Sequence, residues 1–484
     1  MKQYRQKFDT FIRQYDDVGY ICSKKDFGDR VFDAVGAVFL TALSRKPQTL
    51  KELIDKIYPQ FIDVDKETLT EDVVVFYTML EEDGFIVSGN SETELDQKDR
   101  RFSYSDLNPK TINNDFTPIL KRSEVNTQDF LEQHFKDKPH LMDFQIELTS
   151  RCNERCVHCY IPHSNKLDDI DDNLFYSVLE QCKEMGLLDI TLSGGEAMLH
   201  PHFIDYLRKA KEYDFSVSVL SNLTLLNDEI VREMKENRLS SVQVSLYSMN
   251  PEVHDAITQK KGSFYKTRDA ILKLIENDIP LQISCPTMKQ NKNDFAEVLK
   301  WANSLRVRTI TDYIMMARYD HTTDNLYNRL SLEEAGKIIR QDLENDEDMK
   351  SKIQRTDFDL LQSLDDSEDR VCGVCMTSLC MVANGGVYPC SGWQCRILGN
   401  LKTQTLKDIW ENSEDVKYLR NIRKKDFLKC QKCEDKVFCS MCMVRNANEN
   451  PEGDPFKINE HFCKVAALNK QIVLEWEKNH LKNT

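Results

Sequence analysis

The stretch Cys152-Asn-Glu-Arg-Cys156-Val-His-Cys159 directly follows a short apolar segment, residues 144–149, and decides how the rest of the chain is interpreted. Three cysteines separated by three and two residues suit a cubane 4Fe-4S cluster, because thiolates ligate such clusters and three ligands leave one iron open. A structural zinc site would recruit a fourth protein ligand. His158 is a poor choice for that role, because it adjoins Cys159 in the loop. The stretch therefore predicts an iron–sulfur site with an open iron.

A second motif, Ser193-Gly194-Gly195-Glu196, ends another predicted strand some thirty-odd residues later. The two motifs together resemble the radical S-adenosylmethionine superfamily. The resemblance implies that Cys152, Cys156 and Cys159 hold the catalytic cluster and that the amino and carboxylate groups of S-adenosylmethionine chelate its open iron. A 5′-deoxyadenosyl radical then abstracts a hydrogen atom from the substrate. His158 falls where the family usually has an aromatic residue near the adenine.

The remaining cofactor contacts are expected at strand ends. Gly194 and Gly195 let the backbone approach a ligand amino group without a Cβ clash, and the Glu196 carboxylate can pair with that amino group. Three further residues lie where the family contacts the ribose and carboxylate of S-adenosylmethionine, namely Ser221, Asn222 and Ser245. Polar residues that simply end strands are an equal alternative for each of these three.

Strand-like and helical patterns alternate through residues 141–320. The predicted strands are residues 144–149, 188–192, 215–220, 241–246, 281–285 and 309–315, with helices such as 172–185 and 293–305 between them. Alternation of this kind implies a parallel sheet with right-handed crossovers. Six such units fit the partial (β/α)6 TIM-like barrel of the radical family, so the fold class is α/β.

Residues 1–95 read as a separate module, a winged helix-turn-helix. Strand patterns at 19–22 and 30–32 precede a helix at 34–43. Two capping boxes, Thr49 to Glu52 and Thr68 to Glu71, open two more helices. Gly84 ends the second of these and precedes a strand at 85–87. The module holds 12 Lys and Arg against 18 Asp and Glu, the wrong sign for DNA. Ahead of a radical enzyme it resembles the recognition element of ribosomally made peptides, which binds a leader peptide as an added strand.

Two regions connect these parts to a cysteine-rich end. Residues 96–140 are polar and predict a linker, and residues 321–371 predict an acidic helical bridge in which Ser331 to Glu334 is a capping box. Residues 372–484 are irregular and rich in cysteine, which suggests folding around metal.

The cysteines at 372–463 resemble the SPASM extension, which carries two auxiliary 4Fe-4S clusters in this superfamily. The resemblance implies one cluster on Cys372, Cys390 and Cys442, with a fourth ligand among Cys375, Cys380 and Cys395 or left open to substrate, and another on Cys430, Cys433, Cys439 and Cys463. In many members three residues separate the third and fourth cysteines of the run at 430–442, whereas here only Ser440 and Met441 separate Cys439 from Cys442. Without the family, the paired spacings also suit tetrahedral zinc.

The amino-acid composition limits which partners the protein binds and in which cellular compartment it is expected. The net charge of −15 and a pI near 5.3 argue against nucleic acid as a partner. Sixteen cysteines in a chain without an export signal predict metal ligands rather than disulfides, and the scattered Cys22, Cys182 and Cys285 are expected as buried small hydrophobes. No apolar run approaches the length of a membrane span, so we expect a cytoplasmic protein without a membrane partner.

The leading hypothesis is a radical enzyme with three 4Fe-4S clusters that crosslinks a precursor peptide, similar to the maturases of sactipeptides, ranthipeptides and streptide. A thioether and a carbon–carbon bond both stay open. The alternatives are an enzyme similar to the anaerobic sulfatase maturases, a peptide epimerase, and a zinc-binding winged-helix regulator. The expected partners are the leader-bearing peptide and an electron donor, a flavodoxin or a ferredoxin.

Overall fold

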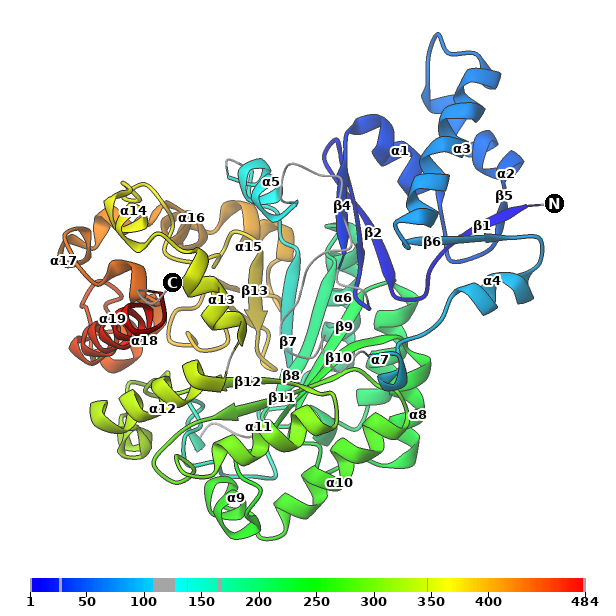
Figure 1. Cartoon of the computed structure of the whole chain (residues 1–484). Coiled ribbons are helices and arrows are strands. Elements are labelled where there is room, and N and C mark those ends of the chain that lie inside the picture. The colour runs from blue at the N-terminus through cyan, green and yellow to red at the C-terminus, as the bar shows by residue number, and fades with distance from the viewer. Residues whose placement is uncertain are drawn as a thin grey trace.

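A nine-stranded sheet forms the centre of the computed structural model, which describes residues 2–25, 28–107, 127–136, 138–163, 168–345 and 347–481 (Figure 1). Its strand order is β12-β11-β10-β9-β8-β7-β13-β14-β15. The first six strands are parallel neighbours: β7 (Asp143–Thr149), β8 (Asp189–Gly194), β9 (Ser216–Ser221), β10 (Leu239–Ser245), β11 (Leu281–Pro286) and β12 (Arg308–Asp312). The helices between them are α6 (Asp172–Glu184), α7 (Phe203–Glu212), α8 (Asp228–Glu236), α9 (Pro251–Thr258), α10 (Ser263–Glu276) and α11 (Phe295–Ser304). The predicted alternation of strands and helices is confirmed.

Side chains alternate between the two faces of this sheet, as the pleat requires. In β7, Phe144, Ile146 and Leu148 are buried in the core that the flanking helices cover. Gln145 and Glu147 therefore point to the other face. The inner face of the barrel is polar at its first strand.

Strand β12 is shorter than predicted. It ends at Asp312, not at Met315, because the Asp312 carboxylate accepts a hydrogen bond from the Ile314 backbone N–H at 2.7 Å. A side chain that bonds the backbone two residues on replaces the strand ladder with a turn.

The cysteine-rich end extends the barrel sheet. β13 (Ser378–Met381) pairs in parallel with β7, and β14 (Gly386–Tyr388) and β15 (Gly399–Asn400) continue the sheet antiparallel. Trp393 and Trp410 belong to the same buried core as Phe144. The helices of this region are α15 (Leu406–Asn412), α16 (Glu414–Asn421), α17 (Leu428–Gln431), α18 (Met443–Glu449) and α19 (Glu460–Leu481). The two regions thus share one core and one sheet.

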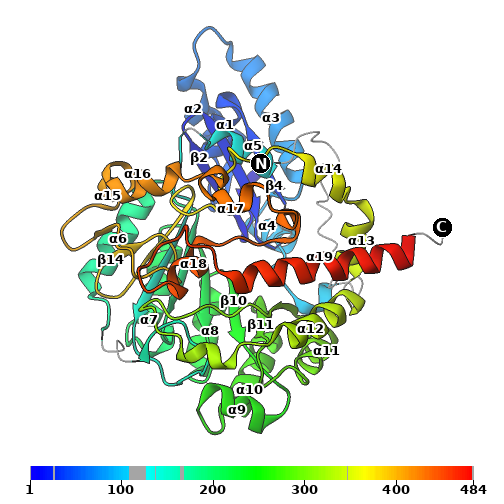
Figure 2. The ribbon, with the colours of Figure 1, turned by 90° about the vertical axis from the view of Figure 1, so that its left-hand side faces the viewer.

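Three helices bridge the barrel and the extension: α12 (Leu332–Asn345), α13 (Glu347–Arg355) and α14 (Phe358–Ser363). The predicted capping box opens α12, since the Ser331 N–H donates to the Glu334 carboxylate at 2.8 Å and the Glu334 N–H donates to the Ser331 hydroxyl at 3.2 Å. α12 packs against α19 (Figure 2). None of the described helices is long and apolar enough to cross a bilayer.

The N-terminal module contains two three-stranded sheets, with strand orders β5-β1-β6 and β2-β3-β4. Its elements are β1 (Gln3–Gln6), β2 (Thr10–Tyr15), β3 (Val18–Ser23), β4 (Asp29–Phe32), α1 (Ala34–Ala42), β5 (Gln48–Thr49), α2 (Leu50–Ile57), α3 (Lys66–Glu82) and β6 (Ile86–Gly89). The capping box of Thr49 and Glu52 is confirmed. The second predicted box is wrong, because Asp65 caps α3 by accepting from the Thr68 N–H, which places Thr68 inside the helix. Beyond it follow α4 (Glu92–Lys98) and α5 (Thr127–His134).

A cluster of charges fastens the module to the barrel at Asp214, between α7 and β9. The Asp214 carboxylate faces the guanidinium groups of Arg45 at 2.5 Å, Arg238 at 3.0 Å and Arg13 at 3.7 Å. Arg13 also donates to the Leu187 carbonyl at 2.8 Å. Arginines from both parts thus share one carboxylate, which holds the pKa of Asp214 low although burial opposes this.

We expect Asp214→Asn to lower the free energy of unfolding by about 2–3 kcal/mol. Three arginines then lose their charge partner, and the Arg238 side chain is only 5% exposed. Asparagine tolerates the positive φ of 62° at this position, so the backbone is preserved. Thermal unfolding and limited proteolysis measure the effect. Asp16→Asn is the matched control, since Asp16 also has a positive φ, 54°, but among the described residues it forms a single ion pair, with the exposed Lys138 at 3.7 Å. Equal stability of the two variants would contradict the prediction.

Candidate functional site

The loop after β7 gathers the three predicted cluster ligands. Cys152, Cys156 and Cys159 are all partly exposed. The Glu154 backbone N–H points to the Cys152 sulfur at 3.5 Å. Burial raises the pKa of the Cys156 thiol well above its ordinary value, and the Glu154 carboxylate and the Cys159 and Cys152 thiols raise it further. The structure therefore brings the three thiols close enough to influence one another.

Neighbouring segments fix the shape of this loop. Its backbone bonds to the end of α9, through Arg155 N–H to the Thr258 carbonyl and Val157 N–H to the Ile257 carbonyl, both 2.9 Å. The Asn325 side chain donates to the His158 carbonyl at 3.3 Å. The loop is thus positioned by chain that lies more than 90 residues away in sequence.

His158 is enclosed within the fold. Its ring meets the Tyr247 ring edge-on, with 5.1 Å between centroids, and the Tyr247 hydroxyl lies 3.4 Å from His158 Nε2. Burial lowers the pKa of His158 to about 4, so the ring is neutral at pH 7. A neutral, partly buried ring suits the packing role that the sequence predicts.

The structure gives a steric reason for glycine at positions 194 and 195 that the sequence did not indicate. A Cβ on Gly194 would lie 2.3 Å from the Thr149 carbonyl oxygen, and one on Gly195 would lie 2.3 Å from the Arg151 carbonyl oxygen. Gly194 also has a φ of +146°. The backbone at the end of β7 and in the cysteine loop approaches both glycines closely. The motif therefore locks the cysteine loop to the end of β8.

Glu196 ties the ends of two strands together. Its buried carboxylate accepts hydrogen bonds from the Met198 N–H at 3.0 Å, the Ser221 hydroxyl at 2.7 Å and the Asn222 N–H at 2.7 Å. The Asn222 side chain in turn donates to Asn153 of the cysteine loop at 2.8 Å. Ser221 and Asn222 thus belong to one network with Glu196.

The other two predicted serines face other partners. The Ser193 hydroxyl accepts from the Gln145 amide at 2.8 Å on the inner face of the sheet. Ser245 hydrogen-bonds to Tyr247, the residue that contacts His158. Both lie at carboxyl ends of barrel strands, the edge at which barrel enzymes build their sites.

Several buried polar atoms at these strand ends have no hydrogen-bond partner among the described residues. They are Glu154 Oε1, His158 Nδ1 and Thr287 Oγ1. Buried polar atoms without a hydrogen-bond partner destabilise a folded protein, so a bound ligand is expected to pair with them. The three thiols suit a charged iron–sulfur cluster, and the unpaired donors and acceptors beside them suit hydrogen bonds to a polar ligand that carries a nucleoside.

Glu147 is a candidate functional residue that sequence reasoning missed. Its side chain is 4% exposed and accepts one hydrogen bond, from the Gln394 amide at 2.7 Å. Burial raises its pKa to about 8. The signal was present in the sequence, since a charged residue interrupts an apolar strand and shares the face of Gln145. Its partner Gln394 lies far along the chain and gave no such signal.

Tyr160 joins the barrel loop to the extension. It follows Cys159 directly, and its buried hydroxyl hydrogen-bonds to Ser391, which follows Cys390. The cysteine loop and the first cysteine set of the extension therefore meet across one Tyr–Ser contact.

The thiols of the predicted first auxiliary set lie near one another. Burial raises the pKa of Cys372 to about 11, and the thiols of Cys442 and Cys390 contribute to the rise, so the three lie near one another. The Gly392 N–H donates to the Cys390 sulfur at 3.4 Å. Of the candidate fourth ligands, Cys375 lies beside Cys372, Cys380 lies beside Cys390, and Cys395 is exposed.

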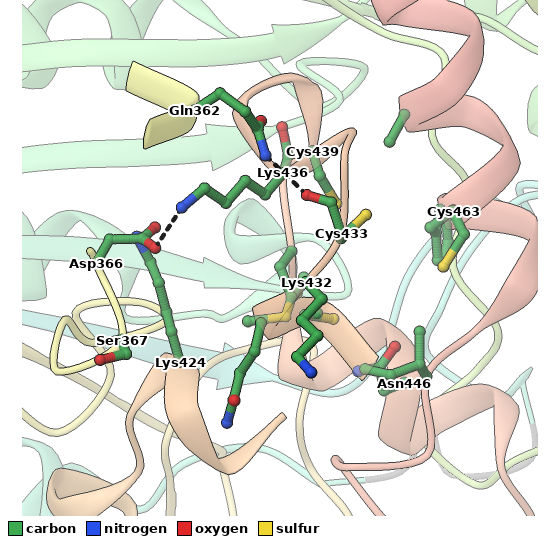
Figure 3. Close-up of a pocket in the computed structure, with 18 of the residues that line it drawn as sticks. Gln362, Asp366, Ser367, Lys424, Lys432, Cys433, Lys436, Cys439, Asn446 and Cys463 are labelled. Atoms are coloured by element: carbon green, nitrogen blue, oxygen red, sulfur yellow. Dashed lines mark hydrogen bonds and ion pairs between the residues drawn. The ribbon is translucent and has the colours of Figure 1, made fainter. Parts of the chain in front are cut away.

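The second auxiliary set lines a cavity of about 610 Å³ (Figure 3). Its members are Cys430, Cys433, Cys439 and Cys463, and Cys442 of the first set also reaches this cavity. Burial and the thiols of Cys439, Cys463 and Cys433 raise the pKa of Cys430 to about 11. Four thiols around one hollow are a donor set that fits a second cluster.

Among the described residues, no three His, Cys, Asp or Glu side chains are placed to hold a single metal ion. One tetrahedral zinc ion would need its sulfurs about 3.8 Å apart. The scattered Cys22, Cys182 and Cys285 are buried, as predicted.

Three family models match the chain. Residues 146–302 match the Radical SAM superfamily, residues 354–434 match SPASM, an iron-sulfur cluster-binding domain, and residues 30–86 match PqqD, coenzyme PQQ synthesis protein D. The first match contains Cys152, Cys156, Cys159 and Glu196.

Characterised proteins are similar over much of the chain. The AdoMet-dependent heme synthase of Methanosarcina barkeri is 25% identical over 321 residues, which is 62% of this chain and 90% of that protein. The antilisterial bacteriocin subtilosin biosynthesis protein AlbA of Bacillus subtilis is 25% identical over 314 residues, 63% of this chain and 68% of that protein. The crystal structure of Streptococcus suis SuiB bound to precursor peptide SuiA superposes with a TM-score of 0.59 at 14% identity, covering 94% of this chain and 99% of that one. This last likeness concerns the fold.

Proposed function

Since the chain is a radical S-adenosylmethionine enzyme with an SPASM domain and a PqqD region, we propose that it modifies a ribosomally synthesised precursor peptide. Iron–sulfur clusters and S-adenosylmethionine are its cofactors. The observation that carries the proposal is the PqqD-type module joined to the barrel through Asp214. Similarity to the subtilosin biosynthesis protein AlbA supports a peptide substrate.

We assign leader binding to the N-terminal module, the predicted winged helix-turn-helix. Strand β4 pairs only with β3 among the described strands, and α5 also contacts it, so an added strand would pair with the backbone of its other edge. Phe32 of β4 stacks edge-on against Phe76 of α3, and Val35 just beyond β4 is 47% exposed. An edge with apolar side chains beside it suits an extended peptide whose alternate residues need pockets.

Each part of the barrel has an assigned task. Cys152, Cys156 and Cys159 hold the catalytic cluster, and His158, Ser193, Gly194, Gly195, Glu196, Ser221, Asn222 and Ser245 surround the place of S-adenosylmethionine. When bound, these cofactors supply a 5′-deoxyadenosyl radical that takes a hydrogen atom from the peptide. Glu147 and Gln394 offer hydrogen-bonding groups on the inner face, where the peptide would lie.

The extension carries two auxiliary 4Fe-4S clusters in this proposal. One is held by Cys372, Cys390 and Cys442, with a fourth ligand among Cys375, Cys380 and Cys395 or left open to substrate, and the other by Cys430, Cys433, Cys439 and Cys463. The product is an intramolecular crosslink, a thioether if a peptide thiolate reaches an open iron and a carbon–carbon bond if all ligands are protein cysteines. Such chemistry needs a reducing compartment, so we place the enzyme in the cytoplasm.

The test uses anaerobically reconstituted full-length enzyme, S-adenosylmethionine, a chemical reductant and a short precursor peptide that contains Cys, Lys or Trp. A crosslink appears as the loss of two hydrogen atoms in mass spectrometry, and epimerisation leaves the mass unchanged. We expect modification of the full-length peptide and a rate at least ~10-fold lower for a peptide without its leader. Equal rates for both peptides would refute the leader assignment.

Leader binding is measured separately by fluorescence anisotropy of a labelled leader. Val35→Asp places a charge beside the β4 edge and is expected to weaken binding by ~10-fold or more. Aspartate is favourable in the first turn of α1, so the helix is preserved. Ile62→Asp is the control, because Ile62 is 86% exposed in the same module away from β4. Equal weakening by both variants would contradict the assignment of this edge.

A further inference from the structure

Glu147 occupies one end of a row of inward-facing residues that crosses the barrel sheet. The strand register from β7 to β12 aligns the members of this row, which are Glu147, Ser193, Leu220, Gln243, Gln282 and Arg308. The four residues between Glu147 and Arg308 are uncharged, and Arg308 lies on β12 at the far edge of the barrel. The row therefore contains one carboxyl group, and its strand neighbours do not balance the charge.

The Glu147 carboxyl group has no cationic partner in the described part of the chain. Burial raises its pKa to about 8, and only the hydrogen bond from Gln394 opposes the rise. Three titratable side chains on surrounding elements interact with it electrostatically, Tyr160 of the cysteine loop, Cys380 of β13 and Tyr388 of β14. The pKa of each is raised, so all three are neutral at pH 7. A buried carboxyl group without a countercharge is unfavourable once it is ionised.

The hydrogen bonds of Glu147 and Gln394 leave only acceptor atoms unused. The Gln394 amide nitrogen donates to Glu147 Oε1 at 2.7 Å and to the Ser391 carbonyl at 3.1 Å, which uses both of its hydrogens. Gln394 Oε1 and Glu147 Oε2 accept no hydrogen bond from a described residue, yet neither belongs to the fully enclosed unpaired atoms of that part of the chain. Both oxygens therefore border open space.

Two acceptor oxygens, one of them from a carboxyl group, define the chemistry of a complementary ligand. A lysine ammonium group carries three N–H donors and an arginine guanidinium group carries five, each with a positive charge. Either can pair with both oxygens and neutralise the carboxylate, which gives strong, charge-assisted hydrogen bonds. A backbone amide has a single donor and no charge, so it would leave one oxygen unpaired. The pair therefore favours a cationic side chain.

The two oxygens lie at the junction of the barrel and the extension. Tyr160, which interacts with Glu147, directly follows Cys159, and Gln394 directly precedes Cys395. A side chain held there would lie between the cysteine loop and the cysteines of the extension. This is the region in which the substrate peptide was placed above.

We propose that Glu147 and Gln394 form a subsite that binds a lysine or arginine side chain of the precursor peptide. The inference rests on the proposed function for the identity of the peptide. On binding, the Glu147 carboxyl group releases its proton to solvent and the carboxylate pairs with the cation, and no other covalent bond changes. Glu147 is thus a specificity-determining residue, which holds a neighbouring residue of the peptide at the reactive centre.

The first test uses n-butylammonium, a lysine side chain without its backbone, and n-butanol as the uncharged counterpart. Thermal unfolding of full-length reconstituted enzyme is followed at pH 8. We expect n-butylammonium, but not n-butanol, to raise the Tm of wild type, and neither to raise the Tm of Glu147→Gln. Glu233→Gln is the control and should respond as wild type does, because Glu233 is also buried but pairs with Arg208 at 2.6 Å on the outer helices. Equal responses of wild type and Glu147→Gln would overturn the subsite.

The second test uses the labelled precursor peptide, with each Lys and Arg outside its leader replaced by norleucine in turn. Without reductant, one replacement should weaken binding by at least ~10-fold in wild type and have no further effect in Glu147→Gln. Glu147→Asp keeps the charge and should retain part of the affinity. At pH 7 binding should release about 0.9 proton per peptide in wild type and none through this site in Glu147→Gln, measured by calorimetry in two buffers. Affinity should therefore rise with pH up to about 8.

Three results of the second test would refute the inference. These are a modified precursor without Lys or Arg outside its leader, losses that simply add in Glu147→Gln, and proton release that this substitution leaves unchanged. If wild type modifies the peptide and one of these results is found, the proposed function stands without the subsite. A response to n-butylammonium that depends on Glu147, together with no modification of any precursor peptide, would instead support the cation site and refute the proposed function.

Discussion

Enzyme in which Cys152, Cys156 and Cys159 are all replaced by alanine is expected to hold about eight irons per chain instead of about twelve, and to lose S-adenosylmethionine cleavage entirely. The reason is that these three thiols are the only protein ligands assigned to the catalytic cluster, whereas the auxiliary sets lie in the extension. The two auxiliary clusters should survive, because their assigned cysteines all lie in residues 372–463 and none belongs to the barrel loop.

Iron and sulfide analysis after anaerobic reconstitution measures this change, and formation of 5′-deoxyadenosine reports cleavage. Cys182→Ala is the control, since Cys182 is buried in α6 and should leave about twelve irons in place. Wild-type protein with about four irons would remove the auxiliary clusters from the proposal. Wild-type protein with no iron after reconstitution would remove the radical chemistry altogether.

Glu147→Gln is expected to make the folded enzyme more stable at high pH, by on the order of 4 kcal/mol at pH 9. Burial raises the pKa of Glu147 to about 8, whereas in the unfolded chain it is near 4.5. The folded state therefore binds this proton more tightly, and stability falls as pH rises from about 4.5 to about 8. Glutamine keeps an acceptor for the Gln394 amide and removes the titration.

Thermal unfolding of the holoenzyme between pH 6 and pH 9 measures the difference, which should widen with pH. Glu233→Gln is a control of opposite sign, because Glu233 is also buried but pairs with Arg208 at 2.6 Å, which lowers its pKa. That variant should lose stability at neutral pH. Parallel pH–stability curves for wild type and Glu147→Gln would show that the Glu147 carboxylate is ionised in the fold.

The features predicted correctly from sequence are those encoded by local patterns. The barrel strands and helices were visible because each is a short apolar or periodic run between turn residues. The capping boxes at Thr49 and Ser331 depend only on residues three apart. Such signals need no knowledge of tertiary contacts.

The features that were missed depend on contacts between distant segments. β1 is polar, and it becomes a strand because it pairs with β5 and β6, more than 40 residues away. Gly194 and Gly195 owe their identity to the backbone of Thr149 and Arg151. The Tyr160–Ser391 contact exists only because β13 pairs with β7. None of these has a local signature.

The arginines gathered on Asp214 have a consequence for the choice of modification site. A recognition module clamped to the barrel holds one end of the peptide at a constant distance from the reactive centre. An extended chain spans at most about 3.3–3.6 Å per residue. The linker between leader and target then acts as a molecular ruler, and the enzyme selects its residue by counting along the peptide as well as by recognising a side chain.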